Sequence, residues 1–494
     1  MTKYNLIIAF IAFSLSANAQ NTSLTEFQSF RENILKDYDS FRKTVMEDYD
    51  KYLEGVWKEY EKFTGHKRDK TPKPKVVPVF KPTDTPPKPV VVEPVVAPKS
   101  EPIPQPEPKP RPIAPSVPST PSAPQVPSVP TLPSTPTPLP KMVTVDFYSN
   151  DIKMPAIENE IVIPPVNSRS DIAKAWKVLK VSSLKNNIPT IKTMLGTLGM
   201  SDWGNAMLIE KYIESLFPQC DVDQQRIATQ FILSNLGYDV RLATNDNQIV
   251  LLIPFDEKIY DMPYLKIADK TYYIYPDNNG RLMSCSLPEG DTGRKMGTIF
   301  SGNINIGIDY KSFTLSGAGI QVKGRVNTAI MSLLNSYVSL GISDIAKCNV
   351  DKSLRNSIVE QVREQVKGLN ELQAANKILQ FVQYAFDYAT DEEQFGREKY
   401  FFMEENLFYP KNDCEDRSVF FAYLIREVLH LPVHLVHYPG HECTAVAYSY
   451  PLSNGTSYTY KGKTYYISDP TYVGANIGMC MPEYLSVKPE IEEW

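Results

Sequence analysis

The chain has 494 residues, of which 42% are hydrophobic, and a formal net charge of −5. This length exceeds what one hydrophobic core usually holds, so we expect two or three domains. The slightly acidic balance and the lack of a basic cluster argue against a nucleic-acid surface, and we expect no nucleic-acid partner.

Residues 1–19 have the pattern of a secretory signal peptide. Lys3 precedes an apolar stretch, and Ala17-Asn18-Ala19 forms a small-residue cleavage site. The stretch is too short to anchor the chain across a bilayer, and no later segment is apolar for long enough. We therefore expect an exported protein with no membrane span, located in the periplasm, at the cell surface or outside the cell.

Residues 20–66 are expected to form one long helix with an aromatic stripe. Aromatic residues recur at every eleventh position: Phe27, Tyr38, Tyr49 and Tyr60. An eleven-residue repeat averages about 3.67 residues per turn, close to a straight α-helix. A helix cannot bury such a stripe alone, so the segment 24–63 self-associates, docks on a partner or folds back on the chain's own domain.

Residues 67–140 are expected to form a disordered, proline-rich linker. The stretch from Thr71 to Pro140 holds 25 of the 41 prolines. Such a density prevents a packed core and favours an extended, semi-rigid spacer.

Three short motifs near the C-terminus carry the residue types of an activated thiol. Asp413 can cap a helix over roughly 415–428, which places Cys414 at a helix N-terminus, where the dipole favours a thiolate. His441 begins an apolar strand, and Asp469 closes another. A thiol, an imidazole and a carboxylate on neighbouring elements form the general pattern of a cysteine nucleophile.

These motifs resemble the transglutaminase-like superfamily, and in particular its secreted bacterial members, over about the last 130 residues. They read Asp413-Cys414-Glu415-Asp416-Arg417, Gly440-His441 and Asp469-Pro470-Thr471-Tyr472. The resemblance implies a papain-related fold with Cys414 as nucleophile, His441 as general base and acid, and Asp469 as the group that orients the imidazole. Many members have a tryptophan near the cysteine, whereas the nearest aromatic residue here is Tyr409.

Acidic residues surround the predicted nucleophile. Asp413, Glu415 and Asp416 are expected to cap the helix and to form ion pairs, with Arg417 as a partner. Their negative charge opposes the thiolate, so His441 must supply most of the activation.

The sequence gives weaker signals for residues that contact a substrate or bind a metal ion. Tyr409, Asn412 and Tyr438 are expected to lie near the substrate. The histidines between 430 and 441 do not share one face of a strand or helix, so we expect no metal site and no cofactor. Cys443 lies two residues after His441 and is expected on the same face of its strand.

The globular part contains an apparent duplication. Lys270-Thr271-Tyr272-Tyr273-Ile274 recurs 193 positions later as Lys463-Thr464-Tyr465-Tyr466-Ile467, and a second block matches at an offset of 191. Under these offsets Asp223 takes the position of Cys414, Gln248 that of His441 and Pro276 that of Asp469. The first copy would then lack a nucleophile. The alternative is that two unrelated units share a pentapeptide.

The predicted fold is α+β, with two tandem transglutaminase-like units. A degenerate unit over 141–285 and a catalytic unit over 346–494 are joined by a small β region over 286–345, and an extra loop over 387–406 walls the cleft beside Cys414. The predicted function is an exported amide hydrolase, a peptidase or amidase that forms an acyl-enzyme on Cys414 and acts on a protein or peptide. Two alternatives stay open: a protein-crosslinking acyl transferase, and a non-enzymatic cell-surface binding or scaffold protein.

Overall fold

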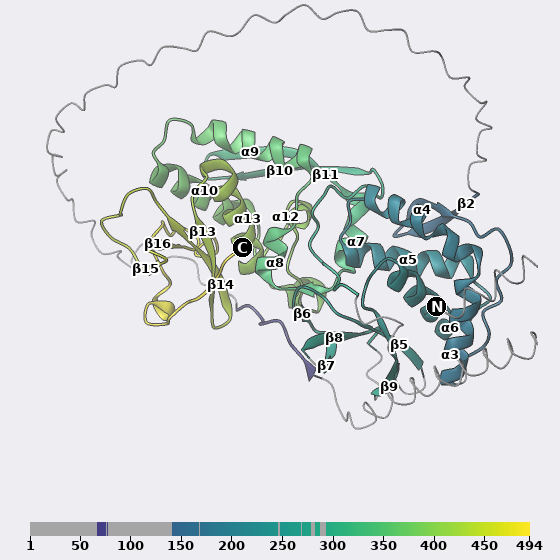
Figure 1. Ribbon diagram of the computed structural model, residues 1–494. Helices are drawn as coiled ribbons and strands as arrows, with labels where there is room; N and C mark the ends of the chain where they lie inside the picture. Colours follow the sequence, from purple (N-terminus) through teal and green to yellow (C-terminus); the bar gives the residue numbers. More distant parts are fainter. Residues whose placement is uncertain are drawn as a thin grey trace, which may run out of the picture.

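The computed structural model describes residues 67–75, 77 and 141–494, except for 167, 246–247, 268, 278–281 and 287–292. The predicted signal peptide, the aromatic helix and most of the proline-rich segment lie outside these residues. None of the described helices is long and apolar enough to cross a membrane. The described part combines helices with antiparallel sheets (Figure 1), which confirms the α+β class.

The first half of the globular part places a layer of helices against a six-stranded sheet (Figure 1). A hairpin of β2 (Met142–Phe147) and β3 (Asn150–Pro155) leads into the helices α3 (Arg169–Lys180), α4 (Ser183–Thr197), α5 (Asp202–Leu216) and α6 (Val222–Asn235). The sheet has the order β1-β7-β8-β5-β4-β9. Its strands are β1 (Lys67–Arg68), β4 (Arg241–Asn245), β5 (Gln248–Ile253), β7 (Pro263–Ile267), β8 (Lys270–Tyr275) and β9 (Leu282–Ser286).

A connecting region joins the two halves. Its main feature is a two-stranded hairpin that lies along two helices of the second half (Figure 1). The elements are the hairpin strands β10 (Tyr310–Gly317) and β11 (Ile320–Asn327), then the 3-10 turn η1 (Thr328–Ile330), α7 (Met331–Asn335), β12 (Ser339–Leu340) and α8 (Ile342–Lys347). Strand β12 pairs with β6 (Ile259–Tyr260), so this region is also attached to the first half.

The second half packs its helices on a five-stranded sheet of order β15-β16-β14-β13-β17. Its helices are α9 (Lys352–Val366), α10 (Glu371–Ala385), α11 (Asp391–Phe395), α12 (Met403–Phe408) and α13 (Cys414–Leu424), which continues as the π-helical turn η2 (Ile425–Leu429). Its strands are β13 (Val433–Tyr438), β14 (His441–Ala447), β15 (Ser457–Tyr460), β16 (Lys463–Ser468) and β17 (Glu490–Glu492), and the 3-10 turn η3 (Pro482–Tyr484) precedes the last one.

Helix α13 forms the centre of this half. All of its residues are buried, and a helix without a solvent face belongs to the core. Strand β14, which contacts α13, is likewise buried at every position. The element that carries Cys414 and the strand that carries His441 are therefore held by packing on all sides, as a rigid site requires.

The two sheets share strand order and register. In sequence order, β4, β5, β7 and β8 take the same places in the first sheet as β13, β14, β15 and β16 in the second. The pair Leu252↔Ile274 has its counterpart in Ala445↔Ile467, and both members lie 193 positions further along the chain. The same offset relates the pairs of β7 with β8 to those of β15 with β16, and those of β4 with β5 to those of β13 with β14.

Candidate active site

Cys414 is the first residue of α13, as the capping pattern predicts. The Asp413 side chain accepts a hydrogen bond from the backbone N–H of Asp416, and the Asp416 carboxylate accepts one from the N–H of Asp413. This reciprocal capping box satisfies two of the free donors at the helix start. The capping box therefore fixes where α13 begins, and with it the position of Cys414 at the start of the helix.

The thiol of Cys414 is fully buried and hydrogen-bonded. It donates a hydrogen bond of 2.9 Å to Glu415 Oε2, and the backbone N–H of Glu442 points at the sulfur. Burial, followed by the charges of Glu415 and Asp413, raises the pKa of the thiol well above its usual value. This shift is opposite in direction to the effect expected from the helix dipole.

His441 and Asp469 form the direct contact of the site. His441 Nε2 lies 2.8 Å from Asp469 Oδ2, and both side chains are almost fully buried. The other Asp469 oxygen accepts hydrogen bonds from the backbone N–H groups of Thr471 and Tyr472. These bonds fix the carboxylate, and the carboxylate fixes the imidazole plane.

Gln383 on α10 holds the loop that carries Asp469. Its amide nitrogen donates to the carbonyls of Asp469, Tyr472 and Ala475, and its amide oxygen accepts from the N–H of Gly474. The side chain is 2% exposed. Sequence reasoning missed this residue, although a glutamine on the apolar face of an amphipathic helix was a visible signal.

Aromatic rings stack on one face of the His441 imidazole. Tyr484 stacks on His441 with ring centroids 5.3 Å apart, and Tyr438 stacks on Tyr484 at 4.8 Å. The Nδ1 atom of His441 has no hydrogen-bond partner among the described residues. One nitrogen of the imidazole is thus held by Asp469 while the other is free to exchange a proton.

Three other residues of the predicted site make contacts within the protein. Asn412 is fully buried and bonds Asn406 at 2.5 Å, so it supports the loop before α13. Tyr409 packs its ring against three phenylalanines: Phe395, Phe401 and Phe408. Arg417 donates to the carbonyls of Gln383 and Phe386, which corrects the expected ion pair with the neighbouring acids. Buried helix-end carbonyls attract its guanidinium because no water reaches them.

A group of buried acids lies at the start of α13, next to Cys414. Asp391, Asp413 and Asp416 each present one carboxylate oxygen within 4.8 Å of the others. Asp391 Oδ1 and Asp413 Oδ2 have no hydrogen-bond partner among the described residues. Burial raises the pKa of Asp391 to about 9 and that of Asp413 to about 6. Oxygen donors of this kind suit a hard divalent cation such as Ca²⁺.

His441, Cys443 and Asp469 form a second group with metal-ligand atoms, again within 4.8 Å of one another. Cys443 shares the face of β14 with His441, as the two-residue spacing predicts. It is fully buried, and burial raises the pKa of its thiol. The cysteines at 220, 348, 414, 443 and 480 are all free.

The predicted counterparts in the first half lie near the corresponding backbone places, but not all at them. Asp221 caps α6 as Asp413 caps α13, so Asp223 is the second residue of its helix whereas Cys414 is the first of its own. Asp223 lies in the first turn of α6, and its carboxylate accepts a 2.9 Å hydrogen bond from the N–H of Ile249. The N–H that points at Cys414 belongs to Glu442, which lies 193 positions after Ile249. An aspartate and a cysteine therefore meet the same backbone donor in the two halves.

The remaining two counterparts follow the same pattern. Gln248 begins β5 as His441 begins β14, and each pairs with the last residue of the preceding strand. Pro276 directly follows β8 as Asp469 directly follows β16. A proline has no carboxylate and a glutamine side chain does not exchange protons near neutral pH, so the first half lacks the acid–base pair.

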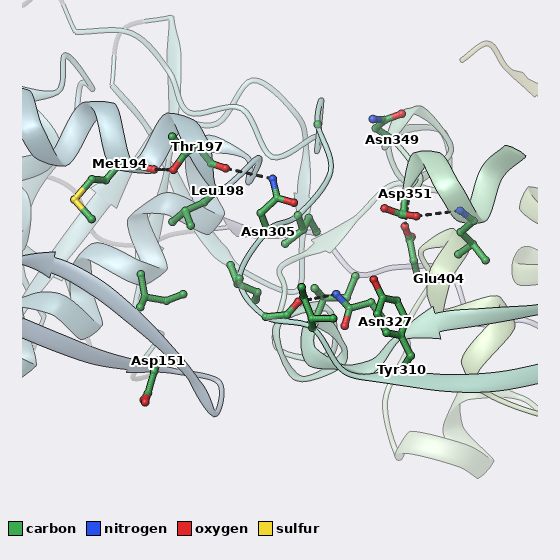
Figure 2. A pocket seen from close by; sticks show the side chains of 18 of the residues that line it. Asp151, Met194, Thr197, Leu198, Asn305, Tyr310, Asn327, Asn349, Asp351 and Glu404 are labelled. Carbon is green, nitrogen blue, oxygen red and sulfur yellow. Dashed lines mark hydrogen bonds between the residues drawn. The ribbon is translucent and has the colours of Figure 1, made fainter.

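A large cavity lies away from these residues. It has a volume of about 480 Å³ and is bordered by the first half, the connecting region and the start of α9. Figure 2 shows Thr197, Leu198 and Asn305 on one side and Asp351 and Glu404 on the other. Burial raises the pKa of Glu404 to about 7. None of the three predicted catalytic residues borders this cavity.

Comparisons with protein-family models, with curated proteins and with solved structures found no match for this chain.

Proposed function

We propose that the protein is an exported cysteine-dependent amide hydrolase, a peptidase or amidase, with the second half as its catalytic unit. The observation that carries this proposal is the buried His441–Asp469 pair, which leaves Nδ1 free beside the helix that starts at Cys414. Buried pairs of an imidazole and a fixed carboxylate are common where a base must take a proton from a nucleophile. The predicted leader at 1–19 would carry the enzyme out of the cytoplasm.

The chemistry divides between three side chains. His441 Nδ1 takes the thiol proton, and the Cys414 sulfur attacks the carbonyl carbon of the amide. The imidazolium, stabilised by Asp469, then gives the proton to the leaving amine as the carbon–nitrogen bond breaks. Water, activated by the same imidazole, attacks the thioester and releases the acid. The N–H groups at the start of α13 are the donors available to the oxyanion.

The thiol must lose its bond to Glu415 before it reacts. That bond and complete burial favour the neutral thiol, so a substrate that enters the site has to displace the thiol from Glu415 toward His441. A substrate amide that takes the place of the thiol on Glu415 would therefore activate Cys414 by binding.

We further propose that the two halves are tandem units of the transglutaminase-like fold, the first of them degenerate. The shared strand order and the constant offset of the strand pairs support a duplication, because unrelated sheets have no reason to agree in register. The proposed role of the first unit is to support the second and to help hold the substrate.

A second candidate is a non-enzymatic binding or scaffold protein. The raised thiol pKa and the burial of the site favour it, since a reactive cysteine usually has a lowered pKa and some exposure. If the protein is an enzyme, the same three residues would serve hydrolysis and acyl transfer. The two reactions differ only in whether water or an amine attacks the thioester.

An epoxysuccinyl inhibitor of thiol proteases separates these candidates. We expect a single covalent adduct that maps to Cys414 and is lost in Cys414→Ala. Cys443→Ser is the matched control, because it removes the other buried thiol on the strand of His441, and it should keep the adduct. Because the site is buried, the same measurements are made on Lys75→Pro, which loses a main-chain hydrogen bond to Gly440 beside His441. Absence of any adduct on Cys414 in both proteins, together with hydrolysis of peptide libraries that Cys414→Ala does not change in either, would favour the scaffold.

A further inference from the structure

A short extended segment connects the sheet of the first half to the candidate active site. Strand β1 pairs with β7, with Lys67 opposite Tyr264. The chain then leaves the first sheet and runs to the turn before β14; Figure 1 shows it as the purple trace that starts near β7. The sequence predicts a disordered linker from residue 67 onward, but residues 67–75 and 77 contact both halves.

The first half of this segment is fixed by Asp261. The N–H of Asp261 donates to the carbonyl of Asp69 at 2.7 Å, and its carboxylate lies 3.2 Å from the Lys70 ammonium. Thr71, which is 8% exposed, donates its hydroxyl to the same carboxylate. The segment therefore enters the second half from a defined point.

Lys75 then bridges two sides of the site. Its N–H donates to the carbonyl of Gly440 at 2.8 Å, and its carbonyl accepts a 3.0 Å hydrogen bond from the hydroxyl of Tyr388. Gly440 precedes His441, and Tyr388 belongs to the loop over 387–406 that the sequence places beside Cys414. Main-chain hydrogen bonds of this kind hold an extended peptide irrespective of its side chains.

Local features of the surface fit an extended basic peptide. Gly440 has a φ of +75°, which favours glycine, and the Lys75 side chain lies directly over it, because an added Cβ would be 2.7 Å from Lys75 Cε. Lys73 forms a 2.6 Å ion pair with Glu392. Val77 packs against the apolar cluster that contains Tyr438 and Tyr484.

The catalytic candidates are closed off in this arrangement. Cys414, His441 and Asp469 are 0%, 1% and 2% exposed, so no amide bond can reach the sulfur unless covering residues move. We propose that the surface of Tyr388, Glu392 and Gly440 is a binding site for an extended, lysine- and proline-containing peptide, and that residues 71–75 and 77 of this chain fill it in cis and close the active site. The closing role rests on the proposed function, whereas peptide binding does not.

Point variants of the full chain test the closure. Lys75→Pro removes the donor to Gly440, and Tyr388→Phe removes the donor to the Lys75 carbonyl. A hydrogen bond worth about 1 kcal/mol changes an opening equilibrium about fivefold. We expect each variant to raise the rate of Cys414 alkylation by iodoacetamide about three- to tenfold, and the double variant by more than tenfold, as read by peptide mapping. Lys367→Ala is the control, since Lys367 forms its exposed ion pair with Glu364 at the end of α9 and takes no part in holding the segment, and it should alkylate at the wild-type rate.

A synthetic peptide with the sequence of residues 71–77, blocked at both ends, gives a second measurement. It should slow alkylation of Cys414 in Lys75→Pro, and a peptide with both lysines replaced by glutamate should not. Equal alkylation in wild type and double variant, without protection by the peptide, overturns the proposal. So does amide hydrolysis that is as fast in wild type as in Lys75→Pro. Protection by the peptide without any turnover supports the binding site and contradicts the hydrolase instead.

Discussion

Gln383→Met tests whether one buried amide holds the catalytic loop. Methionine has a similar length and fills the same space, so the main change is the loss of four hydrogen bonds between α10 and residues 469–475. The four heavy-atom distances are 3.0 to 3.1 Å, and the side chain is 2% exposed, so water does not replace the lost partners. The three carbonyls share two N–H hydrogens and the amide oxygen accepts one bond, so at about 1 kcal/mol for each of three full bonds the free energy of unfolding should fall by on the order of 3 kcal/mol.

The matched control is Gln380→Met, one turn earlier on the same helix. Gln380 makes a single 3.0 Å hydrogen bond to Asn476, in an exposed setting. Its loss should cost less than about 1 kcal/mol. Urea unfolding at equilibrium measures both variants. Equal midpoints for Gln383→Met and Gln380→Met would refute the assignment of the loop to Gln383.

Gln383→Met should lower hydrolysis as well as stability. Because Gln383 holds the Asp469 carbonyl, its loss frees the carboxylate that orients His441. We expect hydrolysis by Gln383→Met to fall at least about tenfold under conditions where the variant is folded, since small displacements of catalytic groups cost that much. Normal kcat in a destabilised variant would mean that the loop keeps its geometry without the amide.

Four further predictions concern the site and its surroundings. Cys414→Ala and His441→Ala should each lower turnover of a peptide substrate by about 10³-fold or more, and Asp469→Asn by less, because the three groups act as a unit; equal loss in all three would contradict this order. Asp223→Cys combined with Gln248→His should give no new activity, since Pro276 offers no carboxylate; hydrolysis by Cys414→Ala carrying both changes would refute that expectation. Glu404→Gln should flatten the pH dependence of stability: burial raises the pKa of Glu404 to about 7 from 4.5, so the contribution of this group to stability is fully present below pH 4.5 and falls by roughly 3 kcal/mol as the pH rises to 7. Parallel pH–stability curves for the variant and wild type would exclude this ionisation. Deletion of residues 20–66 should leave the activity on small substrates unchanged but lower the oligomeric state or remove a bound partner, and sedimentation that shows both forms as monomers without a partner would contradict this.

The sequence alone determined the local features of the second half. The capping pattern at Asp413 and Asp416 placed the start of α13 at Cys414, and an apolar run placed His441 at the start of the strand β14. Caps and apolar runs act over a few residues, so they are legible without knowledge of the fold. The offset of 193 also predicted the shared register, because the spacing of strands within each half sets which residues pair.

Only the tertiary structure decided the electrostatics and the long-range contacts. Burial, which depends on all neighbouring elements, raises the pKa of Cys414 and reverses the effect expected from the helix dipole. Tyr484 reaches His441, and Gln383 reaches the Asp469 loop, across long stretches of chain that carry no common motif. Lys75 contacts Tyr388, 313 positions later, from a segment whose composition predicts a free linker. The composition of a segment predicts its conformation in isolation. Where the segment lies in the fold depends on the surfaces that other parts of the chain supply.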